Sequence, residues 1–301
     1  METMSYQDRI NRVLRHIEKT LGTRPDLAEL ADIACFSPYH FHRIFSSMVG
    51  ESVAAYVRRL LLERSALQVA HTSEPITQIA LDAGYESVDA FTRAFRAHFA
   101  SLPSEYRRSG GHLTLARQKN PDMPLFHHQI IGAPALDIRL VKFPAVLVAA
   151  MRHTGPYDDS GPTWGKLLAA LGPAGLLGQH TVAYGVSYDN PDVTPKQKCR
   201  MDACISLPAS VSQESPQVRE LLCNREIFLR QIGGDCDYVA VKVHGPYDRL
   251  HPAYRSLFGL WLPQSGREPT NDPGFEAYYN SPETTAPENL LTEIFIPLKT
   301  Q

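Results

Sequence analysis

Residues 34–45 (ACFSPYHFHRIF) and residues 80–95 (ALDAGYESVDAFTRAF) decide the fold of the N-terminal third of the chain. An offset of fifty residues matches Ser37 with Ser87, Phe41 with Phe91, Arg43 with Arg93, Phe45 with Phe95 and Tyr56 with Tyr106. Matches of residue type in one register indicate a duplicated unit. In each copy a serine stands where a helix N-cap would stand, and apolar residues then recur four apart. Each copy therefore predicts a helix that begins just after its serine.

Both predicted helices have an apolar face and an opposite, mostly polar face. The apolar residues are Phe41, Ile44 and Phe45 in the first helix and Phe91, Ala94, Phe95 and Phe99 in the second. The opposite faces carry Tyr39, His42 and Arg43 in the first and Asp89, Ala90, Thr92 and Arg93 in the second. Shorter helices are predicted before them, over residues 27–33 and 76–81, each followed by a tight turn. This is the helix-turn-helix pattern, whose second helix enters a major groove, so we expect both polar faces to be free.

A longer helix is predicted between the two copies, over residues 52–71, which have apolar side chains at helical spacing and no Gly or Pro. About twenty residues at about 1.5 Å each give roughly 30 Å. Successive major grooves on one face of a duplex lie about 34 Å apart. The helix is therefore long enough to hold two reading helices in adjacent grooves.

This part of the chain, about residues 5–108, resembles the double helix-turn-helix domain of the AraC/XylS transcription regulators. The resemblance is carried by Ile79 together with GYES, FTRAFRAHF, Leu102-Pro103 and Tyr106-Arg107-Arg108. It implies a DNA-binding domain over residues 1–109, with bases contacted by Tyr39, His42 and Arg43 in the first unit and by Val88, Asp89, Ala90 and Arg93 in the second. Many members have amides or hydroxyls where Val88, Asp89 and Ala90 stand, so the base preference does not carry over. Asp89 could accept a hydrogen bond from a cytosine amino group.

The charge of the chain is close to balanced, at −2 overall, and residues 1–109 hold 13 Lys and Arg against 13 Asp and Glu. DNA binding must therefore depend on where the arginines lie, and they gather on and just after the predicted reading helices. No apolar run approaches the roughly 20 residues that span a bilayer, and the first residues lack the features of a signal peptide. We expect a cytoplasmic protein without a membrane partner.

A polar stretch over residues 110–135 has the composition of a linker. Beyond it, strands are predicted at residues 136–141, 145–152, 181–187, 199–207, 238–244, 275–279 and 291–297, and helices at residues 164–171 and 251–261. AMRHTGPY at residues 150–157 and AVKVHGPY at residues 240–247 repeat at an offset of ninety. Two strand–helix–strand halves predict an α+β domain with a pseudo-two-fold duplication and a ligand cleft where the halves meet.

Residues 136–301 resemble the GyrI-like effector domain, a module that binds small molecules in multidrug-responsive and Rob-like regulators. The paired GPY turns carry the resemblance, together with YGVSYDNP at residues 184–191, RMDAC at 200–204, FEAYYNSP at 275–282 and EIFIP at 293–297. It implies that Glu293 lies in an aromatic pocket and meets a cationic or amphipathic ligand. Tyr184, Trp164, Tyr278, Tyr279 and Phe295 are the candidate walls. The alternative is that Glu293 faces water on an edge strand and the aromatic residues belong to the core.

These observations predict a sequence-specific transcription regulator of the activator type, which binds double-stranded DNA and a small-molecule effector, with RNA polymerase as a further candidate partner. No cofactor is expected. No metal is expected either, because the histidines lack acidic or cysteine partners at ligand spacing and the five cysteines form no C-x-x-C pair. The alternatives are a hydrolase that uses a pocket glutamate to activate water, and a protein-interaction module.

Overall fold

The computed structural model describes residues 4–22, 26–110 and 136–300. The chain divides into two compact units. The first, which we call the helical unit, comprises Met1–Pro38 and Met48–Gln129, and the second, the sheet unit, comprises Tyr39–Ser47 and Ile130–Gln301. The first reading helix is thus grouped with the sheet unit over most of its length. The linker predicted over residues 110–135 lies outside the described residues, apart from Gly110.

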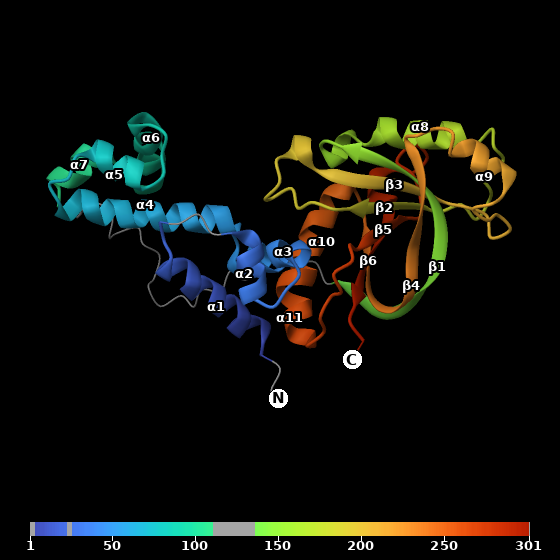
Figure 1. The fold of residues 1–301 in the computed structure, drawn as a ribbon, viewed down its shortest axis with the longest axis horizontal. Coiled ribbons are helices and arrows are strands. Elements are labelled where there is room, and N and C mark those ends of the chain that lie inside the picture. The colour runs from blue at the N-terminus through green and yellow to red at the C-terminus, as the bar shows by residue number, and fades with distance from the viewer. Residues whose placement is uncertain (1–3, 23–25, 111–135, 301) are drawn as a thin grey trace. The chain divides into compact units, whose positions relative to one another are not determined.

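The helices predicted over residues 27–33, 52–71 and 76–81 and after Ser87 are present in the helical unit (Figure 1). They are α1 (Tyr6–Lys19), α2 (Leu27–Ile33), α4 (Val53–His71), α5 (Ile76–Asp82), α6 (Val88–Phe99) and α7 (Pro103–Arg108), while α3 spans Pro38–Val49. The predicted cap at Ser87 is confirmed, because its side chain accepts a hydrogen bond from the Ala90 backbone N–H at 3.2 Å. Ser52 caps α4 in the same way, accepting from Ala55. These bonds satisfy backbone donors that a helix start leaves unpaired.

One hydrophobic cluster holds the second helix-turn-helix onto the end of α4. Its buried members are Leu62, Ala66, Val69, Ile79, Ala80, Phe91, Phe95 and Tyr106. The Phe91 and Phe95 rings lie 5.5 Å apart between their centroids, and Phe95 meets Tyr106 edge-on at 5.3 Å. The apolar face that the sequence pattern predicts for α6 is therefore the face that packs.

The sheet unit contains six antiparallel strands that close on themselves in the order β1-β3-β2-β5-β6-β4. They are β1 (Asp137–Thr154), β2 (Ala183–Ser187), β3 (Arg200–Ser206), β4 (Ile227–His244), β5 (Phe275–Tyr278) and β6 (Leu291–Leu298). The sequence predicted two short strands where β1 is continuous, and only the second half of β4. Both expectations are wrong for one physical reason. Pro144 and the Gly233-Gly234 pair mark a bulge between β1 and β4, where the register shifts, and not a break in either strand.

Close packing at this bulge requires glycine. Gly233 has a φ of +81°, and a Cβ there would lie 2.2 Å from the Pro144 carbonyl oxygen. The two 18-residue strands β1 and β4 can therefore bend together at the bulge and remain paired on both sides of it. The sheet therefore continues through Pro144 and Gly233-Gly234, although these residues by themselves indicate turns.

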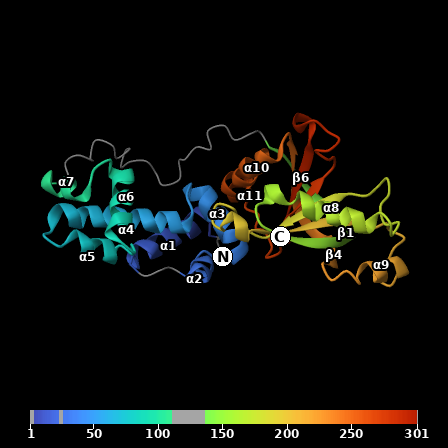
Figure 2. The same ribbon diagram turned by 90° about the horizontal axis from the view of Figure 1, so that it is seen from above.

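Helices lie against the outside of the sheet, as Figures 1 and 2 show. They are α8 (Gly161–Leu171), α9 (Pro216–Leu221), α10 (Leu250–Ser256), a π-helical turn (Leu257–Trp261) and α11 (Leu262–Ser265), with 3₁₀ turns at Tyr157–Asp159, Lys196–Lys198, Tyr247–Arg249 and Pro287–Asn289. Leu167 and Leu171 of α8 and Val218 of α9 pack on Met151 and Ile205 of the sheet. The helix predicted over residues 251–261 exists, but a π turn interrupts it. Such turns are rare and frequently occur at functional sites.

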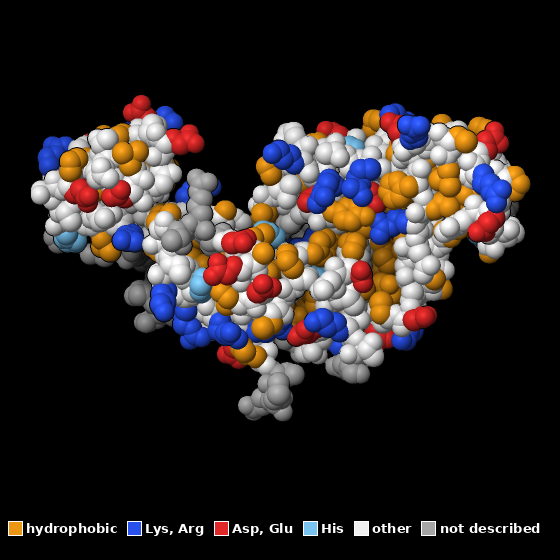
Figure 3. All heavy atoms as spheres, in the orientation of Figure 1, with side chains coloured by type: hydrophobic (Ala, Val, Ile, Leu, Met, Phe, Trp, Pro, Cys, Tyr) orange, Lys and Arg blue, Asp and Glu red, His pale blue; other side chains and the backbone are white. Residues whose placement is uncertain are grey.

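The inside of the closed sheet is an aromatic core. Phe275 and Phe295 stack with their ring centroids 4.9 Å apart, and Phe143 packs edge-on against both. Tyr184 and Tyr238 complete the same cluster. Figure 3 shows Lys and Arg interspersed with Asp and Glu over the visible surface of each unit, in keeping with the small net charge. None of the described helices is both long and apolar enough to span a membrane.

Candidate ligand site

The six residues predicted to form one ligand pocket all lie in the sheet unit. Tyr184 and Phe295 belong to the aromatic core inside the sheet. Glu293 and Tyr279 lie together at one end of β6. Trp164 and Tyr278 meet edge-on, with ring centroids 5.7 Å apart, near the start of α8. A single pocket formed by all six residues therefore stays a prediction.

Glu293 is buried and already has partners. Its carboxylate accepts a hydrogen bond from the Tyr279 hydroxyl at 2.7 Å and pairs with the Arg139 guanidinium. Lys242 stands directly opposite Glu293 across the β4–β6 ladder. A cavity of about 380 Å³ is lined by Arg139, Lys242, Tyr279, Leu291 and Glu293. Two cationic side chains therefore flank one carboxylate, so this cavity does not carry the net negative charge that would attract a cation.

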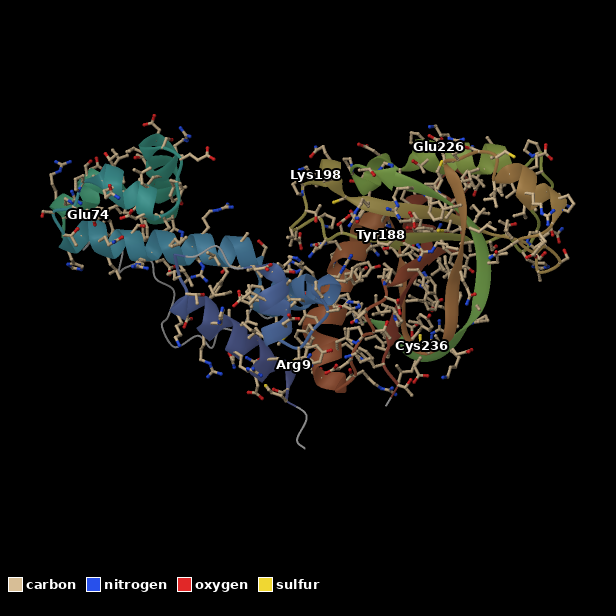
Figure 4. All side chains as sticks on the ribbon, viewed as in Figure 1. Arg9, Glu74, Tyr188, Lys198, Glu226 and Cys236 are labelled. Carbon is tan, nitrogen blue, oxygen red and sulfur yellow. The ribbon has the colours of Figure 1, made fainter. Side chains whose placement is uncertain are left out.

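Asp202 on β3 is a second buried carboxylate with the same kinds of partner. Tyr188, labelled in Figure 4, donates its hydroxyl to Asp202 at 2.6 Å. Arg230 contacts the same oxygen at 2.8 Å, and Arg152 pairs with the other. Both oxygens of the Asp202 carboxylate therefore have partners, which are two guanidinium groups and a phenol. It is a structural network in which the charge of the buried carboxylate is compensated by two guanidinium groups.

Glu276 on β5 has a different environment, because tyrosines and not cations hold its carboxylate. It is 6% exposed and accepts hydrogen bonds from the Tyr254 hydroxyl at 2.9 Å and the Tyr278 hydroxyl at 2.6 Å. Burial raises the pKa of Glu276, although the two hydroxyls and Arg43 oppose that rise. A buried carboxylate whose charge is not fully compensated attracts a cation.

Aromatic rings extend this environment into what we call the Glu276 site: Glu276, Tyr254, Tyr278, Tyr247 and Trp164. The Tyr278 ring meets Tyr247 edge-on at 5.6 Å and Trp164 at 5.7 Å between centroids. Gly185 of β2 stands opposite Glu276 in the sheet, and a Cβ at Gly185 would lie 2.5 Å from the Tyr278 hydroxyl. Glycine at this position therefore makes room for the phenol that holds the carboxylate.

The Arg43 guanidinium of α3 lies beside the Glu276 site, against the ring of Tyr254. Its guanidinium carbon lies 4.9 Å from the centroid of the Tyr254 ring and 5.6 Å from that of Tyr39, and the residue is 9% exposed. One nitrogen donates to the Asp189 carbonyl at 3.2 Å. Burial alone would lower the pKa of Arg43, but the surrounding tyrosines and Glu276 raise it. The predicted reading helix thus brings a cation close to a tyrosine that holds the Glu276 carboxylate.

Neighbouring residues of α3 fix the same contact. The Tyr39 hydroxyl donates to the Ser187 carbonyl at 2.7 Å, and the His40 ring lies 5.6 Å from that of Phe258. A Cβ at Gly259, in the π turn, would lie 2.8 Å from the backbone oxygen of Ser47. Residues 39–47 therefore pack along α10 and the π turn with backbone in close contact. The polar face that we expected to be free is covered by the sheet unit, because its tyrosine and arginine find aromatic and carbonyl partners there.

The family follows from matches to known proteins. Residues 136–299, more than half of the chain, match the GyrI-like small molecule binding domain. The chain belongs to the GyrI-like family. Residues 30–109 match a helix-turn-helix domain, so an AraC-type helix-turn-helix domain stands before the GyrI-like domain.

Curated relatives are similar to the first third of this chain. The uncharacterized HTH-type transcriptional regulator YbfP of Bacillus subtilis is 36% identical over 104 residues, which are 35% of each chain. The right origin-binding protein of Escherichia coli is 37% identical over 100 residues, 33% of this chain and 35% of that protein. The match thus spans about a third of the length of these relatives. The EcmrR C-terminal domain superposes with a TM-score of 0.44 at 20% identity, covering 56% of this chain and 99% of that one.

The GyrI-like chain presents its second predicted DNA face differently from its first. Asp89 and Arg93 of α6 are exposed, and Val88 and Ala90 are half-buried at the start of the same helix. Val88 packs against the hydrophobic cluster at the end of α4. The polar side chains of α6 are thus open to solvent, whereas Tyr39 and Arg43 of α3 are engaged.

Sequence reasoning missed Glu276, although the chain carries the signal. Glu276 stands between Phe275 and Ala277 in a predicted strand, and a carboxylate in an otherwise apolar strand is the feature that singled out Glu293. The same argument applies to both residues. Among the described residues of this GyrI-like chain, no group of three or more His, Cys, Asp and Glu side chains is placed to hold a metal ion.

Proposed function

We propose that this protein is a DNA-binding transcription regulator whose GyrI-like domain senses a small cationic molecule at the Glu276 site. The observation that carries the proposal is a buried carboxylate held by two tyrosine hydroxyls and walled by aromatic rings. The match to a small-molecule-binding family supports the sensing role, and the helix-turn-helix domain supports DNA binding.

The chemistry of the Glu276 site favours a cation over a neutral or anionic ligand. A cation near the buried carboxylate stabilises its ionised form, which burial disfavours. Each aromatic face in contact with a cation adds about 0.5–2 kcal/mol. Hydroxyls that donate to the carboxylate also keep it oriented toward the rings. The same group would bind a neutral ligand without this electrostatic gain.

The cavity beside Glu293 is a second candidate site, because it is open and has a volume of about 380 Å³. Its lining of Arg139, Lys242 and Glu293 suits a ligand that carries an anionic group as well as a donor for the glutamate. Glu293 and Tyr279 then act as positioning groups at the cavity wall, while Arg139 and Lys242 attract the ligand charge.

On DNA, α6 is proposed to contact bases through Asp89 and Arg93, with Val88 and Ala90 at its start. Tyr39, His42 and Arg43 of α3 would occupy the next major groove once they are released. Arginine can pair bidentately with guanine, and each such pair contributes about 1–3 kcal/mol of discrimination. An activator of this type acts by recruiting RNA polymerase, which is therefore a proposed partner.

The proposed duplication of the GyrI-like domain has support in the strand order and in the buried acids. Exchanging β1 with β4, β2 with β5 and β3 with β6 leaves the order of the closed sheet unchanged. Glu293, Tyr279 and Arg230 each stand ninety-one residues after Asp202, Tyr188 and Arg139, respectively. The two halves thus repeat an acid and a tyrosine at matched positions. They differ in that two arginines fill the Asp202 network, while a cavity remains at Glu293.

Titration of the full chain with a panel of amphipathic aromatic cations, beginning with benzamidinium, tests the proposal. Saturable binding that is lost in Glu276→Gln and kept in Glu293→Gln is expected, because the amide removes the charge and keeps the shape. Binding lost only in Glu293→Gln would move the site to the other cavity. Chromatography of the ligand after incubation tests the hydrolase alternative, and we expect the ligand to be recovered intact. A domain that binds no cation and captures a protein would support the interaction module.

A further inference from the structure

Arg43 is a cation that the chain stacks on Tyr254, which is a wall of its own proposed ligand site. We infer that the Glu276 site is selective for planar, delocalised cations of the guanidinium type, and that such a ligand binds by displacing residues 39–47 of α3. The inference rests on the proposed function. It adds the chemical class of the ligand and the means by which ligand binding would reach DNA.

The class of ligand follows from what the site holds. A guanidinium is flat and weakly hydrated, so it stacks against aromatic rings at lower desolvation cost than an ammonium. The Arg43 guanidinium carbon lies within 6.0 Å of the ring centroids of Tyr254, Tyr39 and Phe258. Burial raises the pKa of Glu276 and the charge of Arg43 opposes that rise, so the guanidinium stabilises the carboxylate while the tyrosines hold it. An amidinium or guanidinium on an aromatic body reproduces these contacts and can reach further toward Trp164.

A ligand at the Glu276 site would displace residues 39–47 because both need the Tyr254 ring. Tyr39 contributes one face of the cage around Arg43 and is anchored on Ser187 at 2.7 Å. Ser47 lies against the π turn at Gly259 with no room for a side-chain atom between them. A ligand that takes the place of the guanidinium therefore competes with the whole segment from Tyr39 to Ser47, not with one flexible side chain.

Ligand binding and DNA binding by α3 would then both favour the released state, in which residues 39–47 have left the Glu276 site. Tyr39 and Arg43 cannot contact bases while they are enclosed by Tyr254, Phe258 and the carbonyls of β2 and its following turn. A ligand that binds the released state better than the enclosed state shifts the population toward release. Because such coupling is reciprocal, DNA should strengthen ligand binding by the same factor.

Gly259→Ala separates displacement from every residue that touches the ligand or the DNA. The new Cβ would meet the Ser47 backbone oxygen at 2.8 Å and its Cβ at 2.9 Å, so the segment must move away. Alanine is the best helix former, so the helix that carries it gains local stability. Gly165→Ala in α8 is the matched control, because a Cβ there meets nothing within 4 Å. Arg43→Met is a second variant, which removes the guanidinium from the aromatic rings and keeps an unbranched apolar stem.

Calorimetric titration of the full chain with benzamidinium, beside neutral benzamide, measures the competition. We expect Gly259→Ala and Arg43→Met to bind benzamidinium about tenfold more tightly than the wild type, because apparent affinity falls with the fraction of competent protein. Gly165→Ala should match the wild type, and benzamide should bind none of them. Equal benzamidinium affinity in the wild type and both release variants would overturn displacement and leave the proposed site standing. Absence of benzamidinium binding to all four proteins would overturn the cation site, and the proposed function with it.

Discussion

The two reading helices α3 and α6 come from matched stretches of sequence and have different surroundings. Arg93 of α6 is exposed, whereas Arg43, at the same place in the repeat, is enclosed by Tyr254, Tyr39 and Phe258. Their apolar faces are alike, since Phe41 and Phe91 are both fully buried. The comparison shows that a repeat determines which face of a helix packs inward, while the outward face depends on what else the chain can place against it.

The largest expected effect is on the free energy of unfolding, and it tests whether the apolar faces of α3 and α6 are equally well packed. Phe41→Ala and Phe91→Ala should each lower the free energy of unfolding by about 3–5 kcal/mol, because each removes a fully buried ring and leaves a cavity. Urea denaturation measures both. A loss below about 1 kcal/mol for either variant would show that its inner face is not the packing face.

The polar faces of α3 and α6 should differ in how much they contribute to DNA affinity. Without ligand, Arg93→Ala should weaken binding by about 1–3 kcal/mol on the preferred sequence, as expected for a base contact. Arg43→Ala should cost less, because the enclosed arginine contributes to DNA binding only in the released fraction. Fluorescence anisotropy with a duplex selected from a random library by the full chain measures both at one salt concentration. Equal losses would argue that α3 is already free.

Acid should act on α3 through His40, which stands where α6 has Ala90. Burial, with help from Arg43, lowers the pKa of His40 to about 3, so the folded state holds it neutral. The unfolded side chain takes up a proton near pH 6.5, so stability falls as the pH drops through that value. Between pH 7.5 and 5.5 the loss should be about 1.4 kcal/mol.

Denaturation at both pH values measures this loss as the difference between the wild type and His40→Ala. Subtraction removes the contributions of the other histidines. Identical pH dependence in the two proteins would contradict the burial of His40.

The smallest effect concerns the Glu276 carboxyl. Burial raises the pKa of Glu276 and the positive charge of Arg43 opposes that rise, so Arg43→Met should raise the pKa further. Arg93→Met should leave it unchanged. Carbon-13 NMR of labelled glutamate follows the titration, and an unchanged pKa in Arg43→Met would place the guanidinium outside the Glu276 site.

Local signals were sufficient to predict the helices. The Ser87 cap, the spacing of Phe91 and Phe95 and the Gly-bearing turn at 83–85 all act within one or two helical turns, and α6 begins and ends close to where they indicate. The paired strands were harder to predict. Pro144 and Gly233-Gly234 indicate turns in isolation, and only their position opposite each other in the sheet makes them a bulge.

The candidate site depended on contacts that no spacing rule reports. Trp164 and Tyr278 meet although they lie in different halves, while Tyr184 and Phe295 turn to the inside of the sheet. Whether a strand residue faces the core or a helix depends on the register of its neighbours. The contact of Arg43 with Tyr254 joins positions more than two hundred residues apart in sequence. It could be inferred only once α3 and α10 were seen together.

The affinity of the full chain for its selected duplex, with and without saturating benzamidinium, tests the central claim most directly. If Arg43 and the ligand compete for the Glu276 site, benzamidinium should strengthen DNA binding by the wild type about tenfold and should not affect Gly259→Ala, in which α3 is already released. Wild-type DNA affinity that stays constant or falls while benzamidinium is bound would contradict the account.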